Sequence, residues 1–198
     1  RFDPEIMPVS IPQRKGEPKV FARDECPRET PYEAMARMKP AFQKDGFGTA
    51  GNASIISDGA AAVVVMSREK AEASGCTIMA TIGAQAAYGI DMKYVLVAPI
   101  WAIPKCLQKE GVGIDDVDLF EVNEAFSGST VAVMNELGLS AEKTNVNGGS
   151  VALGHPIGAS GCRVLVTLLH EMIRRDKKTG LASLCLGGGE AVAMVVKR

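Results

Sequence analysis

The amino-acid sequence predicts an α/β protein in which strands and helices alternate along much of the chain. Two observations support this prediction. Short apolar runs of strand length recur after residue 57, and between them lie segments whose apolar residues repeat with the roughly 3.6-residue period of a helix. Such alternation favours a largely parallel sheet covered by helices on both faces.

Residues 1–56 are predicted to be irregular. Seven of the ten prolines fall between Pro4 and Pro40, where they interrupt regular structure repeatedly. The short features expected here are an extended piece at Lys19–Ala22, a turn at Pro27–Pro31, a brief helix within Tyr32–Lys39 and a small-residue loop at Gly46–Ser54. A plain connector is one interpretation of that loop.

Regular elements are predicted from residue 57 onward. The apolar run Ala60–Met66 is long enough for a buried strand, and Ser67–Ser74 is expected to be a helix after it. The later elements, in the order strand, helix, strand, helix, helix, strand, strand, are Thr77–Ala87, Ala98–Glu110, Val117–Val122, Ala125–Leu137, Cys162–Arg175, Leu181–Leu186 and Ala191–Val196. The run Gly59–Val65 resembles Glu190–Val196, which indicates a duplicated fold if each run is the last strand of one of two similar halves.

Composition and charge argue against several classes of function. Hydrophobic residues make up 46% and charged residues 23% of the 198 positions, as in an ordinary globular protein with a sizeable core. The net charge of −1 gives no electrostatic basis for binding nucleic acid or an anionic membrane, and no apolar run approaches the length of about 18 residues that a membrane span needs. With five scattered cysteines and two histidines, a disulfide framework or a metal site is not expected, and a reducing cytoplasmic setting is.

The chain is expected to be a fragment or one half of a larger protein. It has no initiator methionine and no signal peptide, and its first residues lead directly into the strand-like segment Ile6–Ile11.

The most distinctive stretch is Asn147–Gly161, which contains five glycines in fifteen residues and leads into an amphipathic helix. Glycine offers no side chain for packing, so the backbone itself is used for its shape. His155 lies in this loop, where unpaired amide groups and the helix dipole favour a developing negative charge. The spacing matches neither the phosphate-binding loop of nucleotide hydrolases nor the dinucleotide-binding fingerprint.

Together with two further motifs, this block resembles the thiolases, which make or cleave 3-ketoacyl-CoA thioesters. The motifs are Asn123-Glu124-Ala125-Phe126 upstream and Cys185-Leu186-Gly187-Gly188-Gly189 downstream, in the order and spacing of that family. The resemblance implies a layered α-β-α-β-α fold, of which this chain supplies the C-terminal half and part of the loop domain. It implies that 1–56 belong to the loop domain covering CoA, 57–76 end the N-terminal half, and 77–198 form the C-terminal domain.

The resemblance also implies roles for individual residues. His155 would polarise a thioester carbonyl and activate the nucleophilic cysteine, Asn123 would fix a water in the first oxyanion hole, Cys185 would transfer protons, and the Gly187 N–H would serve the second oxyanion hole. The residues implied along the pantetheine arm of CoA are Ser54, Phe42, Ala125 and Phe126. No cofactor or metal is implied beyond the CoA thioesters themselves.

From the residues alone, two of these positions have simpler interpretations. Asn123 precedes a helix and could be only its N-cap. Cys185 ends an apolar strand and could be a buried structural cysteine, because a thiol acts as an acid or base only when its neighbours lower its pKa.

The activity implied is a reversible Claisen condensation and thiolysis of short-chain acyl-CoA, such as acetyl-CoA and acetoacetyl-CoA, in fatty acid metabolism. The acyl-accepting cysteine lies in the first half of thiolases, so the chain alone is expected to be inactive and to need that half, in a homodimer or homotetramer. The other cysteines, Cys26, Cys76, Cys106 and Cys162, are expected to be structural or incidental. After the three glycines, thiolases usually carry methionine or glutamine and then glycine, whereas this chain has Glu190 and Ala191. The length of the acyl chain of the substrate is therefore left open.

Three rival interpretations differ in their motifs. Ketoacyl synthases would have a histidine in place of Cys185, and sterol-carrier-type thiolases would have a histidine-containing block in place of Asn123–Phe126. A non-catalytic acyl-CoA-binding or scaffold subunit with the same fold remains an alternative.

Overall fold

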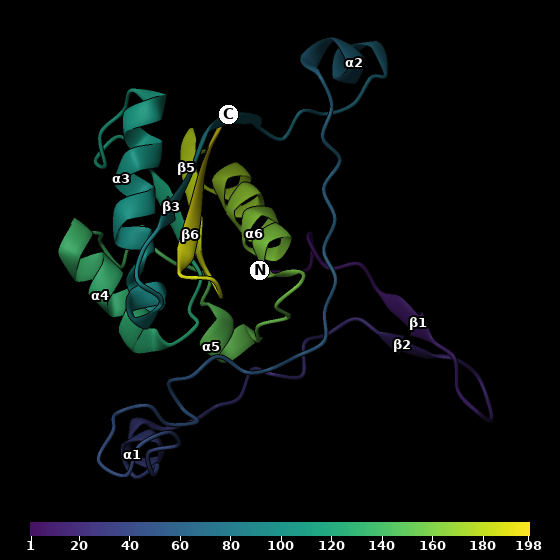
Figure 1. Cartoon of the computed structure of the whole chain (residues 1–198). Helices are drawn as coiled ribbons and strands as arrows, with labels where there is room; N and C mark the ends of the chain where they lie inside the picture. Colours follow the sequence, from purple (N-terminus) through teal and green to yellow (C-terminus); the bar gives the residue numbers. More distant parts are fainter.

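The computed structural model describes all 198 residues, and its regular part is a sheet with helices on both faces (Figure 1). The sheet consists of β3 (Thr81–Gly89), β4 (Leu119–Val122), β5 (Thr179–Leu186) and β6 (Glu190–Lys197). Helices α3 (Pro99–Glu110) and α4 (Ser127–Leu137) cover one face, and α6 (Ser160–Arg174) covers the other. The predicted α/β class is confirmed, with three of the layers expected for the family.

The sheet is mixed, so the prediction of a largely parallel sheet is wrong. Its strand order is β3-β6-β5-β4, and only β4 and β5 run parallel. The physical reason lies in the connection between β5 and β6, where Gly187–Gly189 form a short turn with Gly189 at φ 86. A tight turn can only join antiparallel strands, whereas parallel strands need a long crossover. The chain between β4 and β5 supplies such a crossover.

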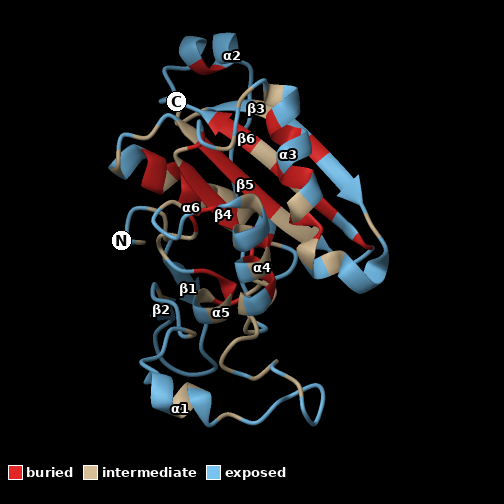
Figure 2. Cartoon of the chain, turned by 90° about the vertical axis from the view of Figure 1, so that its left-hand side faces the viewer, coloured by how far each residue is buried: buried red, intermediate tan, exposed pale blue.

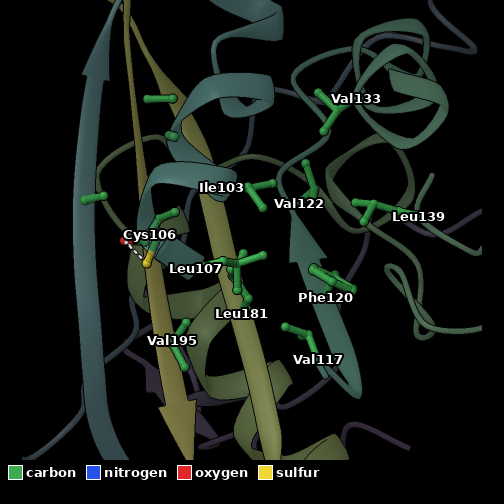
Figure 3. Close-up of a cluster of buried hydrophobic side chains, with 14 of the residues drawn as sticks. Ile103, Cys106, Leu107, Val117, Phe120, Val122, Val133, Leu139, Leu181 and Val195 are labelled. Carbon is green, nitrogen blue, oxygen red and sulfur yellow. Dashed lines mark hydrogen bonds between the residues drawn. The ribbon is translucent and has the colours of Figure 1, made fainter. Parts of the chain in front are cut away.

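Two apolar clusters hold the helices on the sheet. Figure 3 shows the larger cluster, in which Ile103 and Leu107 of α3 pack toward Leu181 of β5 and Val195 of β6. The smaller cluster lies beneath α6 and includes Leu168 and Met172. Burying an aliphatic side chain of this size contributes about 1.5 to 3 kcal/mol, so these clusters are the main stabilising feature of the body.

The elements before β3 are short and exposed (Figure 2). They are β1 (Val9–Ile11), β2 (Lys19–Phe21), α1 (Tyr32–Ala36) and α2 (Arg68–Ala73). Strands β1 and β2 form an isolated antiparallel hairpin. The short helices predicted in Tyr32–Lys39 and Ser67–Ser74 are confirmed.

The run Ala60–Met66 is not the buried strand that its composition predicts. It has no strand partner, and Val64 and Val65 are 84% and 67% exposed. A strand apolar on both faces requires neighbouring strands and covering helices, and no strand pairs with this run. Only one of the two similar runs, the one within Glu190–Lys197, is therefore a strand here.

The remaining differences concern boundaries and short helices. Helix α4 begins two residues later than predicted, at Ser127, and α6 begins two residues earlier, at Ser160. Two short helices were not predicted: the 3-10 helix η1 (Met92–Val97) and α5 (Ser150–Leu153), which lies within the glycine block. No helix in the structure has both the length and the apolar character needed to cross a bilayer.

Candidate active site

The candidate site lies where β4 and β5 end. These two strands are parallel, with Val122 opposite Ser183, so their carboxyl ends meet at one edge of the sheet. Asn123 directly follows β4, and its N–H donates to the Ser183 carbonyl at 3.0 Å. Cys185 lies two residues farther along β5. The structure therefore brings two of the predicted motifs together at one edge.

Asn123 is buried and does not act as a helix cap. The following helix begins only at Ser127, after Phe126 in the cap position, so the N-cap interpretation is wrong. The side-chain Oδ1 of Asn123 accepts a hydrogen bond from the Ser150 hydroxyl at 2.6 Å. Its Nδ2 is buried without any hydrogen-bond partner. An unsatisfied buried donor costs about 1 to 3 kcal/mol, which points to a ligand or water that receives it.

The glycine block is held in place by hydrogen bonds to Ile55 and Glu124. The Ile55 N–H donates to the Ser150 carbonyl at 3.3 Å, and the His155 N–H donates to the Ile55 carbonyl at 2.7 Å. Glu124 accepts from the Val151 N–H at 3.2 Å and packs so closely on Gly149 that any Cβ at that glycine would collide with its carboxyl group.

Gly154, next to His155, cannot be replaced by another residue without strain. Its φ is +97°, a region that L side chains rarely adopt, and an added Cβ would lie 2.5 Å from the Ser57 hydroxyl. The Cys26 sulfur lies on the same side of this glycine. The backbone shape that places His155 therefore depends on glycine here.

The hydrogen bonds around His155 indicate which of its ring nitrogens carries the proton. Nδ1 lies 2.6 Å from the Ser160 hydroxyl, and that hydroxyl donates to the Pro156 carbonyl at 3.1 Å. Since a hydroxyl has one proton to donate, Ser160 accepts from Nδ1–H, and Nε2 keeps its lone pair. Burial, followed by the nearby positive charge of Arg163, lowers the pKa of His155, so the ring is neutral at physiological pH.

Cys185 is half-buried near the end of β5, opposite Ala191 of β6. Burial outweighs a hydrogen bond to its own backbone and raises the pKa of its thiol, so this group is protonated at neutral pH. Gly187 and Gly188 follow in the turn, are exposed, and have open space where a side chain would stand. A substrate can therefore approach the backbone of this turn closely.

The four residues predicted along CoA lie together at the start of α4. The Ser54 N–H donates to the Ala125 carbonyl at 3.1 Å, and Ala53 forms a bridge with Phe126. The Phe42 and Phe126 rings pack edge to face, with centroids 5.5 Å apart. Phe42 is nevertheless 67% exposed. The loop at Gly46–Ser54 is thus docked on the sheet edge and is more than a plain connector.

Residues 76–198 match the family "Thiolase, C-terminal domain", and residues 1–69 match "Thiolase, N-terminal domain". The chain belongs to the thiolase family. Whole-chain similarity extends to "Acetyl-CoA acetyltransferase" of Pseudomonas aeruginosa, at 56% identity, and of Cupriavidus necator, at 53%; the chain aligns fully and covers 51% of each. It thus spans about half the length of these curated relatives.

Solved structures agree with this assignment. The crystal structure of the Bacillus anthracis acetyl-CoA acetyltransferase matches with a TM-score of 0.96 and 47% identity over 99% of this chain and 50% of that chain. The human mitochondrial 3-ketoacyl-CoA thiolase in complex with CoA matches with a TM-score of 0.85 and 40% identity, over 90% of this chain and 46% of that one.

Sequence reasoning missed a set of polar residues beneath the thiolase motifs. Its members, all buried or partly buried, are Glu121, Ser150, Ser160 and Arg163. Burial and the nearby charges of Glu124, Glu5 and Glu171 raise the pKa of Glu121 to about 8, against the effect of Arg163. The available signal was Glu121 itself, a charged residue inside an otherwise apolar strand. No cluster of three or more metal-ligating side chains is present.

The other cysteines have no disulfide partners. Cys106 is buried in the larger core cluster, where its Sγ lies 3.2 Å from the Ala84 carbonyl oxygen, and burial raises the pKa of its thiol. Cys76 is exposed, and Cys162 lies half-buried on α6.

Proposed function

We propose that this chain supplies half of the active site of an acyl-CoA acyltransferase, with the nucleophilic cysteine provided by residues outside 1–198. The reaction is the reversible Claisen condensation and thiolysis of short-chain acyl-CoA, such as acetyl-CoA and acetoacetyl-CoA, in fatty acid metabolism. The observation that carries this proposal is the buried amide of Asn123, whose Nδ2 has no partner within the chain. A preorganised donor of this kind is what an oxyanion requires.

The names of the relatives support the choice of substrate. Several curated relatives are acetyl-CoA acetyltransferases, and one solved thiolase structure holds CoA. In the proposal, CoA lies along Phe42, Ser54, Ala125 and Phe126, where an edge-to-face aromatic pair offers an apolar wall for the pantetheine arm.

His155 performs two steps in this proposal with the same atom. Its neutral Nε2 first accepts the proton of the nucleophilic thiol, which creates the attacking thiolate. The resulting Nε2–H then polarises the thioester carbonyl, together with a water held by Asn123 Nδ2. The lowered pKa of His155 suits the first step because the ring must start without a proton on Nε2.

Cys185 transfers a proton to or from the second acyl group. In thiolysis the bond between the α-carbon and the keto carbon breaks, and the Cys185 thiol donates its proton to the departing carbanion. The raised pKa of Cys185 keeps that proton in place beforehand. The Gly187 N–H, in the open turn, would hold the oxyanion formed at the keto carbon.

The domain arrangement and assembly follow the family. We assign residues 1–56 to the loop domain over CoA, 57–76 to the end of the N-terminal half and 77–198 to the C-terminal domain. The exposed run Ala60–Met66 supports a missing partner half, since contiguous apolar surface of this kind favours burial. A homodimer or homotetramer of complete subunits in the reducing cytoplasm is the proposed working form.

The decisive experiment is acetoacetyl-CoA thiolysis by the complete protein that contains this chain. His155→Ala and Cys185→Ala should each lower turnover by about 10²–10⁴-fold, with far smaller changes in CoA affinity. Cys76→Ala, at an exposed cysteine, is the matched control and should retain turnover.

Two outcomes would contradict the proposal. Cleavage by residues 1–198 alone, abolished by Cys185→Ala, would place the nucleophile within this chain. Variants that lose CoA binding while the complete wild-type protein shows no turnover would identify a non-catalytic acyl-CoA-binding subunit.

A further inference from the structure

The orientation of the Asn123 amide determines whether this residue can serve an oxyanion. The oxygen and nitrogen of an asparagine side chain have almost the same shape, so a half-turn of the amide exchanges an acceptor for a donor. In the structure Oδ1 faces Ser150, and Nδ2 is the atom left without a partner. Some feature of the chain must favour this orientation over its reverse.

Ser150 is the only side chain that bonds to the Asn123 amide. It is the first residue of α5, it is fully buried, and its Oγ lies 2.6 Å from Oδ1. This is a short distance for a hydroxyl donating to a carbonyl oxygen, at the strong end of the usual range. Figure 1 shows α5 at the end of the sheet, between α4 and α6.

Arg163 favours the direction of that hydrogen bond in which Ser150 donates. Its Nη2 approaches the Ser150 Oγ at 3.5 Å, and its Nη1 lies 3.9 Å from the carboxyl group of Glu121. The side chain of Arg163 is only 20% exposed, so its positive charge acts in a poorly hydrated setting. A hydroxyl beside a cation presents its lone pair to the cation and its proton to the opposite side, which here is Asn123.

We propose that Ser150, oriented by Arg163, is a positioning residue that holds the Asn123 amide with Nδ2 toward the reacting thioester. This inference rests on the proposed function, because it assigns the amide to an oxyanion. With the amide reversed, Nδ2 would donate to Ser150, and an acceptor, Oδ1, would replace the donor that fixes the water of the oxyanion hole. Ser150 thus acts on catalysis through Asn123 and does not touch the substrate.

A double-mutant cycle in the complete protein tests this coupling through thiolysis. Asn123→Ala should lower kcat by about 10²–10³-fold, as for other oxyanion donors. Ser150→Ala should lower kcat by about tenfold with little change in KM, because the interaction matters only in the transition state. In the Asn123→Ala background, Ser150→Ala should have almost no further effect.

Ser183→Ala is the matched control. Ser183 is also fully buried, and its hydroxyl donates to the Val192 carbonyl at 2.8 Å, away from the Asn123 side chain. Both serine variants should lower the melting temperature, but only Ser150→Ala should lower kcat. If Ser150→Ala lowered kcat equally in the wild-type and Asn123→Ala backgrounds, Ser150 would have only a structural role and the inference would be overturned.

A second measurement does not depend on activity. In nuclear magnetic resonance spectra with isotope-labelled asparagine, the Asn123 side-chain NH₂ signal should shift and broaden in Ser150→Ala, and remain unchanged in Ser183→Ala. An unchanged signal in Ser150→Ala would overturn the inference, whether or not the enzyme is active. A mobile amide in an inactive complete protein would support the positioning by Ser150 while rejecting the proposed function.

Discussion

Two apolar runs of almost the same composition differ in strand pairing and in burial. Ala191–Val196 lies inside β6, between β3 and β5, and is mostly buried, whereas Ala60–Met66 is extended, unpaired and exposed. The segments around the two runs differ in the same way, because Ala71 is the one buried residue before Ala86, whereas most of the core lies after it. Apolar sequence therefore gives a segment the capacity to form a core strand, but only neighbouring strands and helices make it one.

Replacing one isoleucine in each region by alanine should show the largest difference in stability between the two regions. Ile103 is fully buried against the sheet, whereas Ile56 is 94% exposed. Ile103→Ala should lower the free energy of unfolding by about 2 to 5 kcal/mol, because it removes buried surface and leaves a cavity. Ile56→Ala should change it by less than about 0.5 kcal/mol. Urea denaturation of both variants measures the difference, and equal losses would show that residue 56 is buried in solution.

The buried carboxyl group of Glu121 should produce a smaller, pH-dependent difference. Its pKa is raised from 4.5 to about 8, so the folded chain keeps a proton that the unfolded chain releases. Stability from this group is therefore complete below pH 4.5 and is lost as the pH rises toward 8. Glu121→Gln should flatten the fall in stability across this window by about 1 kcal/mol per pH unit.

The control for that measurement is Glu33→Gln, at an exposed carboxylate in the first turn of α1. It should leave the pH dependence of the unfolding free energy unchanged. If Glu121→Gln has the same pH dependence as the wild type, the Glu121 carboxyl group is not the one that retains a proton on folding.

The smallest effect is expected in α2, which stands away from the body in Figure 1. The Ser67 hydroxyl accepts from the Lys70 N–H at 3.2 Å and caps this short helix. Ser67→Ala should destabilise the helix locally by about 1 kcal/mol. Hydrogen exchange of the α2 amides should become faster, while the melting temperature of the body stays the same. A lower melting temperature would mean that α2 packs on the body.

The sequence alone was sufficient for features that depend on local chemistry. Apolar periodicity located α3 and α6, because burial of one helix face imposes that pattern, and mostly apolar runs located β5 and β6, because both faces of these strands are covered. The glycine block and its two companion motifs indicated the thiolase family. Local backbone geometry, such as the positive φ of Gly154, requires glycine at certain positions of this block, so the requirement can be recognised in the sequence.

Only the tertiary structure decided the features that depend on distant partners. The direction of β6 relative to β5, the exposure of Ala60–Met66 and the start of α4 beyond Asn123 all follow from which segments meet in space. The same is true of Ser150 and Arg163, which look ordinary in the sequence and gain their importance beside Asn123 and Glu121. Hydrogen-bond direction and burial arise between segments, so no local pattern could reveal them.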